Sequence, residues 1–256
     1  MDKDIFHQMV KIEEHHWWFA ARRKIVDGVI ASLHLPHDAE ILEAGCGTGG
    51  NLAMLAQYGR VYGTELDALA RQYAIDRQIG TIEPGRLPDQ IPFAPRQFDL
   101  VILTDVLEHL DDDNGSLRAL VARLKPDGRV LITVPAFPFL WARHDDTHHH
   151  KRRYVRDGLI GVIEGAGLSI KFVSYYNALL FPMVAGVRML KKSLQKDTDD
   201  LGTPPEALNA LLRAVFSSER HVIGSLPIPF GVSLIALAYL PSPLVGEGRA
   251  SAARPG

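Results

Sequence analysis

The residues best suited to hold a ligand form a short glycine-rich segment, Ile41–Gly50, with the sequence ILEAGCGTGG. Gly45, Gly47 and Gly49 permit a tight turn from a strand into a helix, because glycine adopts backbone conformations that a side chain obstructs. Bare glycines also let a ligand lie against the main chain at the N-terminus of the following helix. The segment therefore predicts a site for a nucleotide-like small molecule.

The acidic residues around this turn help to distinguish between ligands. A dinucleotide site reads G-x-G-x-x-G and holds a pyrophosphate, which a carboxylate at Glu43 would repel. Glu43 instead suits a ligand that carries an ammonium group. The segment Arg60–Glu65 reads as a second strand, and Glu65 stands where a carboxylate accepts the two hydroxyls of a ribose. Asp67 is predicted to cap the next helix.

Two later segments complete a recognisable pattern. Phe98–Asp105 is a mostly apolar run that leads into Val106–Leu110, and Leu124–Pro135 combines a helix end, a Pro-Asp-Gly turn and another strand. Together with the glycine turn and its acids, these motifs resemble the class I methyltransferases that depend on S-adenosylmethionine, including a bacterial subgroup of them. The resemblance implies S-adenosylmethionine as the cofactor, since its amino-acid tail and ribose match Glu43 and Glu65.

The resemblance also implies a set of cofactor-binding residues at the ends of the first four strands. They are Glu43, Gly45, Cys46, Gly47, Gly49, Glu65, Leu66, Arg86, Leu87 and Asp105. The chain departs from the family in one respect: members commonly carry an acidic residue after the third strand, where Arg86 stands here. Backbone groups around Arg86 and Leu87 are therefore expected to hold the adenine.

His109 is the candidate catalytic residue. Methyl transfer needs a nucleophile aligned with the S–CH₃ bond and the exclusion of water, and a hydroxyl acceptor additionally needs a base. His109 follows the fourth strand and has an ordinary pKa near working pH. In an alternative interpretation the Glu108–His109 pair only shapes the pocket. A variant makes Asp105, Glu108 and His109 ligands of a divalent ion, but the prediction for the site is that it holds no metal.

The N-terminal segment is expected to contribute to the choice of acceptor. Trp17, Trp18 and Arg22 lie where N-terminal helices of this fold often cover the cofactor, and aromatic and arginine side chains suit a flat or anionic substrate. The alternative is that both tryptophans only pack the lid while Arg22 and Arg23 are solvated.

A second candidate acceptor segment, Trp141–Tyr154, follows the fifth strand at the edge where α/β sheets bind ligands. The three consecutive histidines, 148–150, are adjacent and cannot all aim at one ion. The resemblance favours an acceptor pocket lined by His144, His150, Arg153 and Tyr154. The alternative is a solvated charged loop.

Alternating strand and helix patterns predict an α/β fold with a doubly wound, mostly parallel sheet. The resemblance implies seven strands in the Rossmann-like methyltransferase arrangement, with an antiparallel last strand at 231–239. Lid or cover helices are expected in 1–36, the cofactor-binding domain in 37–240, and a disordered tail in 241–256.

The stretch 177–226 replaces what is normally a short hairpin and is long enough to indicate a function or an added subdomain. Within it, 178–192 is an apolar run with lysines at its end. It is predicted to cap a hydrophobic pocket, with a dimer face or peripheral membrane contact as alternatives.

Composition is consistent with an enzyme of this kind. The chain has 256 residues, 46% hydrophobic and 23% charged, which is enough to bury a full core. Its formal net charge of −2 gives no electrostatic footprint for nucleic acid. The single cysteine, Cys46, excludes an intramolecular disulfide, and no signal peptide or long apolar run is evident, so the expected location is cytoplasmic.

We therefore expect an enzyme, an S-adenosylmethionine-dependent methyltransferase that moves a methyl group to an O or N nucleophile of a small-molecule or lipid-linked acceptor. Two other interpretations remain open from the sequence: an NAD-binding oxidoreductase, and a non-catalytic partner protein that binds S-adenosylmethionine. The sequence predicts neither the acceptor nor the oligomeric state.

Overall fold

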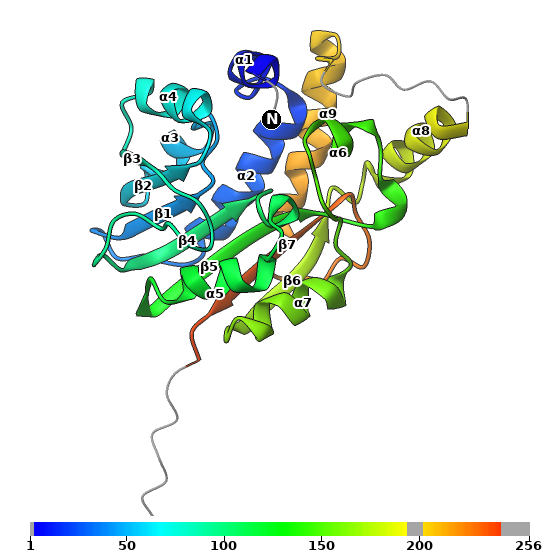
Figure 1. Cartoon of the computed structure of the whole chain (residues 1–256). Helices are drawn as coiled ribbons and strands as arrows, with labels where there is room; N and C mark the ends of the chain where they lie inside the picture. The colour runs from blue at the N-terminus through cyan, green and yellow to red at the C-terminus, as the bar shows by residue number, and fades with distance from the viewer. Residues whose placement is uncertain (1–2, 194–201, 242–256) are drawn as a thin grey trace, which may run out of the picture.

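The computed structural model describes residues 3–193 and 202–241, which form a seven-stranded sheet with helices on both faces (Figure 1). The strands are β1 (Glu40–Ala44), β2 (Arg60–Glu65), β3 (Thr81–Pro84), β4 (Phe98–Thr104), β5 (Leu124–Pro135), β6 (Ser169–Tyr176) and β7 (Ser233–Tyr239). The α-helices are α1 (Lys3–Ile12), α2 (Trp17–Ala31), α3 (Leu52–Leu55), α4 (Ala68–Asp76), α5 (Asp113–Val121), α6 (Arg143–Thr147), α7 (Arg156–Gly165), α8 (Phe181–Ser193) and α9 (Glu206–Ser218). Short 3₁₀ turns are η1 (Leu107–His109), η2 (Pro138–Leu140) and η3 (Glu219–His221).

The strand order is β3-β2-β1-β4-β5-β7-β6. Strands β1 to β5 pair in parallel, for example Ile41 with Leu100, whereas β7 runs antiparallel to both β5 and β6. The predicted fold class, including the antiparallel last strand, is confirmed. A dinucleotide-binding sheet has the order 3-2-1-4-5-6, so the insertion of β7 separates the two architectures.

Both faces of the sheet are buried, and its central strands are mostly apolar. In β4, Leu100 and Ile102 belong to one hydrophobic cluster while Val101 and Leu103 belong to the other, and all four are fully buried. This division follows from the two-residue period of a strand. Helices α2 and α9 cover the first face and α5 and α7 the second (Figure 1).

The long 177–226 insertion contributes a large part of the first face. Phe216 of α9 is fully buried, and its ring lies 5.8 Å from that of Tyr176 in a stacked arrangement. Part of the insertion is therefore core structure rather than an appended surface element. The domain boundaries themselves stay predictions.

Two elements differ from the sequence expectation. The helix expected after the glycine turn is only one turn long, α3, because Gly49, Gly50 and Asn51 belong to the turn before it. The expected Pro-Asp-Gly turn lies instead within β5, where the pairing shifts from Phe98–Leu124 to Leu100–Arg129 and absorbs the extra residues as an irregularity.

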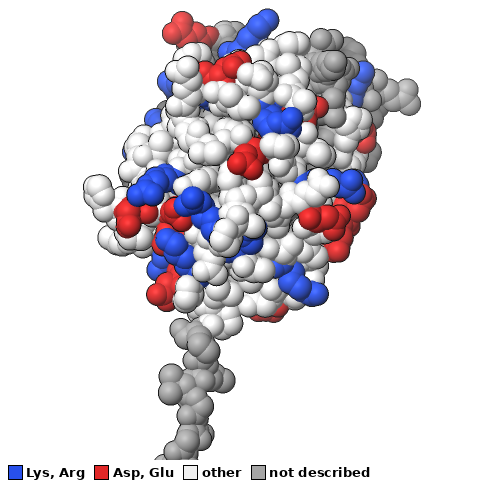
Figure 2. Space-filling view, turned by 60° about the vertical axis from the view of Figure 1, so that its left-hand side comes forward, with Lys and Arg blue, Asp and Glu red and all other residues white. Residues whose placement is uncertain are grey.

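The surface and the chain end add little to the fold. Figure 2 shows a face on which acidic and basic side chains of the described residues are interspersed, without an extended patch of either sign. None of the described helices is both long and apolar enough to cross a membrane. The tail predicted to be disordered, 241–256, lies outside the described residues except for Pro241.

Candidate active site

A cavity of about 1210 Å³ lies at the carboxyl ends of the parallel strands, where open α/β sheets bind ligands. Single-ligand pockets usually measure about 300–1,000 Å³, so this one has room for a cofactor and an acceptor together. Most of the predicted site residues line it: Trp17, Trp18, Arg22, Gly45, Cys46, Gly47, Glu65, Leu66, Arg86, Leu87, Asp105, His109, His144, His150 and Arg153. Three predicted residues, Glu43, Gly49 and Tyr154, are not among the lining residues.

The glycines of the turn serve different purposes. Gly45, Gly47 and Gly49 have φ values of 74°, 54° and 84°, which confirms that the turn needs glycine. A Cβ at Gly45 would lie 2.9 Å from Val106, whereas a Cβ at Gly47 would meet nothing within 4 Å. Gly47 is thus the glycine that leaves open space for a ligand.

Glu65 lies at the end of β2 beside this open space. One carboxylate oxygen accepts the Gly47 N–H at 2.9 Å and the other accepts the Asp67 N–H at 2.8 Å. Each oxygen keeps a second lone pair for a ligand hydroxyl. Burial raises the pKa of Glu65. Asp67 accepts the backbone N–H groups of Leu69 and Ala70, so its predicted role as a helix cap is confirmed.

The structure corrects the expected contact between Glu43 and the ligand. Glu43 is fully buried behind the cavity wall, where Oε1 accepts the Asn51 side-chain N–H at 2.7 Å and Oε2 has no partner. Burial raises the pKa of Glu43 to about 7. Asn51 is itself a lining residue that sequence reasoning missed, and its position just before α3 was the available signal.

The N-terminal segment is fastened to the glycine turn by Glu13, another residue that sequence reasoning missed. Glu13 accepts the Thr48 hydroxyl at 2.7 Å and forms an ion pair with Arg77. A Cβ at Gly50 would collide with the Glu13 carboxylate. Gly49 is not a lining residue because its own Cβ position faces Arg77 and Leu52, 2.8 Å away. These two glycines therefore serve packing.

Arg22 and Asp105 form an ion pair on the cavity wall. Burial disfavours the Arg22 charge, but the attraction of Asp105, together with Tyr176 and Glu43, raises the pKa of Arg22. Asp105 also accepts the Thr133 hydroxyl at 3.0 Å and has a φ of 56°, a strained value for a residue with a side chain. Arg23 donates to the Gly50 carbonyl at 2.9 Å. The alternative of two solvated arginines is therefore wrong.

The two tryptophans combine both roles considered from the sequence. Their rings lie 6.0 Å (Trp17) and 5.3 Å (Trp18) from that of Phe216 on α9, and the backbone N–H of Trp17 donates to the Asn209 side-chain oxygen at 2.8 Å. Both side chains nevertheless line the cavity. Both tryptophans therefore pack against α9 and also face the cavity.

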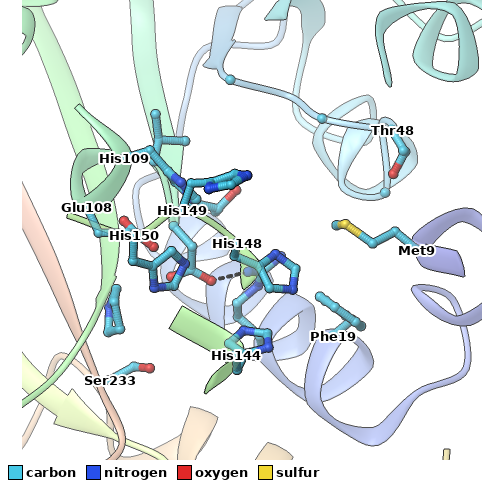
Figure 3. Close-up of a pocket in the computed structure, with 18 of the residues that line it drawn as sticks. Met9, Phe19, Thr48, Glu108, His109, His144, His148, His149, His150 and Ser233 are labelled. Atoms are coloured by element: carbon cyan, nitrogen blue, oxygen red, sulfur yellow. Dashed lines mark hydrogen bonds and ion pairs between the residues drawn. The ribbon is translucent and has the colours of Figure 1, made fainter. Parts of the chain in front are cut away.

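Histidines from two segments meet on the opposite wall (Figure 3). The His109 ring lies 4.7 Å from that of His150, and the rings of His144 and His148 are 4.1 Å apart. Burial, followed by the neighbouring histidines, lowers the pKa of His109 to about 4. His109 is therefore neutral near pH 7. His149, in contrast, is exposed.

Arg153 and Tyr154 point in opposite directions because they stand next to each other in extended backbone. Arg153 makes two hydrogen bonds to the buried Asp145, at 2.8 and 3.0 Å, and contributes to the cavity wall. Tyr154 is buried on the other side and donates its hydroxyl to Asp113 at 2.6 Å. The prediction that Tyr154 lines the acceptor pocket is therefore wrong.

Comparison with known proteins agrees with this geometry. The family model for a methyltransferase domain matches residues 17–173. The chain is 29% identical over 161 residues to a malonyl-acyl-carrier-protein O-methyltransferase of Enterobacter lignolyticus, covering 56% of this chain and 60% of that protein. It is 28% identical over 110 residues to phosphoethanolamine N-methyltransferase 1 of Zea mays, covering 41% and 22%. The aligned regions thus span less than two thirds of either relative.

A solved structure supports the same fold. A chain of the complex between the Haloferax volcanii Trm112 methyltransferase activator and a methyltransferase superposes with a TM-score of 0.62 at 17% identity, covering 93% of this chain and 95% of that chain. The family match extends from α2 through most of β6 and includes the glycine turn, Glu65 and His109. This chain is a member of the methyltransferase-domain family.

Proposed function

We propose that the protein is an S-adenosylmethionine-dependent methyltransferase that transfers a methyl group to an O or N nucleophile of a small-molecule or lipid-linked acceptor. The observation that carries this proposal is the position of Glu65, which accepts the Gly47 N–H at the carboxyl ends of β1 and β2. The surrounding sheet has the strand order β5-β7-β6 at one edge. S-adenosylmethionine is the cofactor, and it supplies an electrophilic methyl group on a sulfonium.

The cofactor half of the cavity is built from groups that suit this molecule. The two Glu65 oxygens accept ribose hydroxyls, and the open face of Gly47 lets the ligand lie against the backbone. Backbone groups near Arg86 and Leu87 hold the adenine. Asn51 presents its polar side chain to the amino-acid tail and connects it to the buried Glu43 carboxylate.

The acceptor half lies against the histidine wall. His109, neutral because its pKa is lowered to about 4, is placed to accept the proton that an acceptor hydroxyl or ammonium loses. His144, His150 and Arg153 provide further polar contacts on the same wall. Trp17 and Trp18 cover the cavity and exclude water from the reacting atoms.

The side chains of helix α8 are the observation that favours a lipid-linked acceptor. Its Met183 and Val187 line the cavity and are also exposed, at 46% and 47% of their surface. Leu179 and Met189 are exposed as well. An apolar tail held along this helix would keep a polar head group at the histidines, and the same side chains would give peripheral membrane contact. Co-sedimentation of the protein with phospholipid vesicles tests the membrane contact, and no co-sedimentation would contradict it.

The activity is tested by transfer of a tritiated methyl group from S-adenosylmethionine into fractionated cell extract. Label in a low-mass or lipid fraction is expected with the wild-type protein and is expected to fall strongly with Glu65→Ala. Binding of S-adenosylhomocysteine without any label transfer across all fractions would favour the non-catalytic partner protein. Binding of NADH, followed by its fluorescence, would instead favour an oxidoreductase.

A further inference from the structure

One part of the cavity brings together three potential metal ligands from two distant segments, Glu108, His109 and His150. Their potential ligand atoms all lie within 4.8 Å of one another. Among residues 3–193 and 202–241, no other group of three or more histidine, cysteine or acidic side chains meets this condition. Figure 3 shows Glu108, His109 and His150 on the same side of the cavity. We call them the Glu-His-His cluster.

Glu108 is the member of the cluster that most requires a partner. Its side chain is fully buried, yet neither carboxylate oxygen has a hydrogen-bond partner. Leaving a carboxylate buried and unpaired is costly, so such groups are usually paired or coordinate a metal. The positive charges of Arg22 and Arg153 act on Glu108, but these arginines already form ion pairs with Asp105 and Asp145. A cation held by the cluster would satisfy Glu108 directly.

His150 is oriented in the way that metal-binding histidines usually are. Its Nδ1 lies 2.8 Å from Oδ1 of Asp145, and Asp145 is fixed in turn by Arg153. An ionised carboxylate only accepts hydrogen bonds, so Nδ1 carries the proton and Nε2 is left with a lone pair. A carboxylate that holds the far side of a histidine ring fixes the ring orientation and raises its basicity as a ligand.

We propose that the Glu-His-His cluster binds a divalent transition-metal ion. Two imidazole nitrogens and one carboxylate oxygen form a donor set suited to Zn²⁺ and also to Fe²⁺, Mn²⁺ and Co²⁺. Ligand atoms around one tetrahedral zinc ion lie about 3.3–3.6 Å apart, given bonds of about 2.0–2.2 Å. Small side-chain rotations, closing the cluster by about 1–1.5 Å, therefore complete the site.

Three protein ligands leave a coordination position open toward the cavity, as in catalytic metal sites. The consequence for catalysis rests on the proposed methyl transfer. An acceptor oxygen bound at that position releases its proton to solvent more readily. Its O–CH₃ bond then forms as the S–CH₃ bond of the cofactor breaks and leaves a neutral thioether. With the metal bound, His109 acts as a ligand and replaces the role of base that the metal-free site would give it. This also departs from the metal-free site expected from the sequence.

The test uses the tag-free full chain after dialysis against a chelator, titrated with zinc chloride by calorimetry and with cobalt chloride by visible absorption. The wild-type protein should bind one ion per chain and give cobalt bands typical of mixed nitrogen and oxygen ligation. Glu108→Gln and His150→Gln should each weaken zinc binding at least tenfold. The matched control is His149→Asn, because His149 is an exposed neighbour with a φ of 56° that asparagine tolerates. The control should bind zinc as the wild type does, within about twofold.

Failure of the proposal is distinguishable from failure of the proposed function. S-adenosylhomocysteine is titrated into the same preparations, and circular dichroism verifies independently that each variant is folded. Zinc binding that is absent from the wild type, unchanged in Glu108→Gln and His150→Gln, or lost equally in His149→Asn would overturn the metal site while leaving the methyltransferase proposal intact. Zinc binding without binding of S-adenosylhomocysteine would retain the metal site and count against the proposed function.

Discussion

Replacing Glu43 with glutamine removes a buried negative charge and keeps the shape of the side chain. The carbonyl oxygen of glutamine still accepts the Asn51 N–H that Glu43 accepts at 2.7 Å. Burial raises the pKa of Glu43 from 4.5 to about 7 in the folded protein. At about 1.4 kcal/mol for each pKa unit, ionising this carboxyl in the folded protein costs on the order of 3 kcal/mol more than in the unfolded chain.

The pH dependence of this cost has a definite sign. Between pH 4.5 and about 7 the folded protein keeps a proton on Glu43 that the unfolded chain has lost. The wild type therefore loses stability as the pH rises through this window. Glu43→Gln does not titrate, so its free energy of unfolding should match the wild type near about pH 4.5 and exceed it by up to about 3 kcal/mol near pH 8. The titration of His109, common to both proteins, cancels in the difference.

Urea unfolding followed by circular dichroism at acidic and alkaline pH measures this difference. Glu83→Gln is the matched control, because Glu83 is exposed and its replacement should leave the stability unchanged. If Glu43→Gln were less stable than the wild type by more than about 1 kcal/mol near pH 8, the reasoning about the buried charge would be refuted. A stabilised variant that binds S-adenosylhomocysteine more weakly would identify Glu43 as a charge retained for the ligand.

Three further substitutions test the site and its support. Gly47→Ala places a methyl group in the cavity at a φ of 54°, so the affinity for S-adenosylhomocysteine, measured by calorimetry, should fall at least tenfold. The control is Gly161→Ala on the exposed face of α7, which should stabilise the protein by about 0.5–1 kcal/mol. Phe216→Ala should lower the free energy of unfolding in urea by about 3–5 kcal/mol, because the Phe216 ring is fully buried. Leu211 on the same helix is exposed, so Leu211→Ala should cost far less. Equal losses of stability would contradict the packing role of α9. Tyr154→Phe should lower stability by about 1–3 kcal/mol through loss of the hydrogen bond to Asp113, which keeps its ion pair with Arg152. Methyl transfer into the labelled fraction should stay unchanged, and a reduced rate with folded protein would restore Tyr154 to the pocket.

The fold, and most of the residues that line the cavity at the ends of β1 and β2, could be predicted from the sequence because their signals are local. Apolar runs identify the strands, and the functional groups stand at the strand ends, as Gly47 and Glu65 do. Parallel strands then bring those ends to one edge of the sheet. The capping role of Asp67 follows from its place just before a helix in the same way.

The rest depended on contacts between residues that are far apart in the chain. Glu13 and Thr48 are separated by 35 positions, and Arg22 and Asp105 by 83, so no local pattern pairs them. The opposite directions of Arg153 and Tyr154 follow from a short bridge between Tyr154 and Ala136 that the loop composition does not reveal. The sequence predicted a ligand contact for Glu43 because a carboxylate suits an ammonium group. In the structure Glu43 is fully buried behind Asn51.

The most direct test of the central claim is calorimetric titration of S-adenosylhomocysteine into the wild-type protein and Glu65→Ala. The wild type is predicted to bind one molecule per chain, and the variant to bind it more weakly by more than about 1 kcal/mol because charge-assisted hydrogen bonds to the ribose are lost. No detectable heat with folded wild-type protein would contradict the assignment of the cofactor. Unchanged affinity in Glu65→Ala would contradict the placement of the ribose at the end of β2.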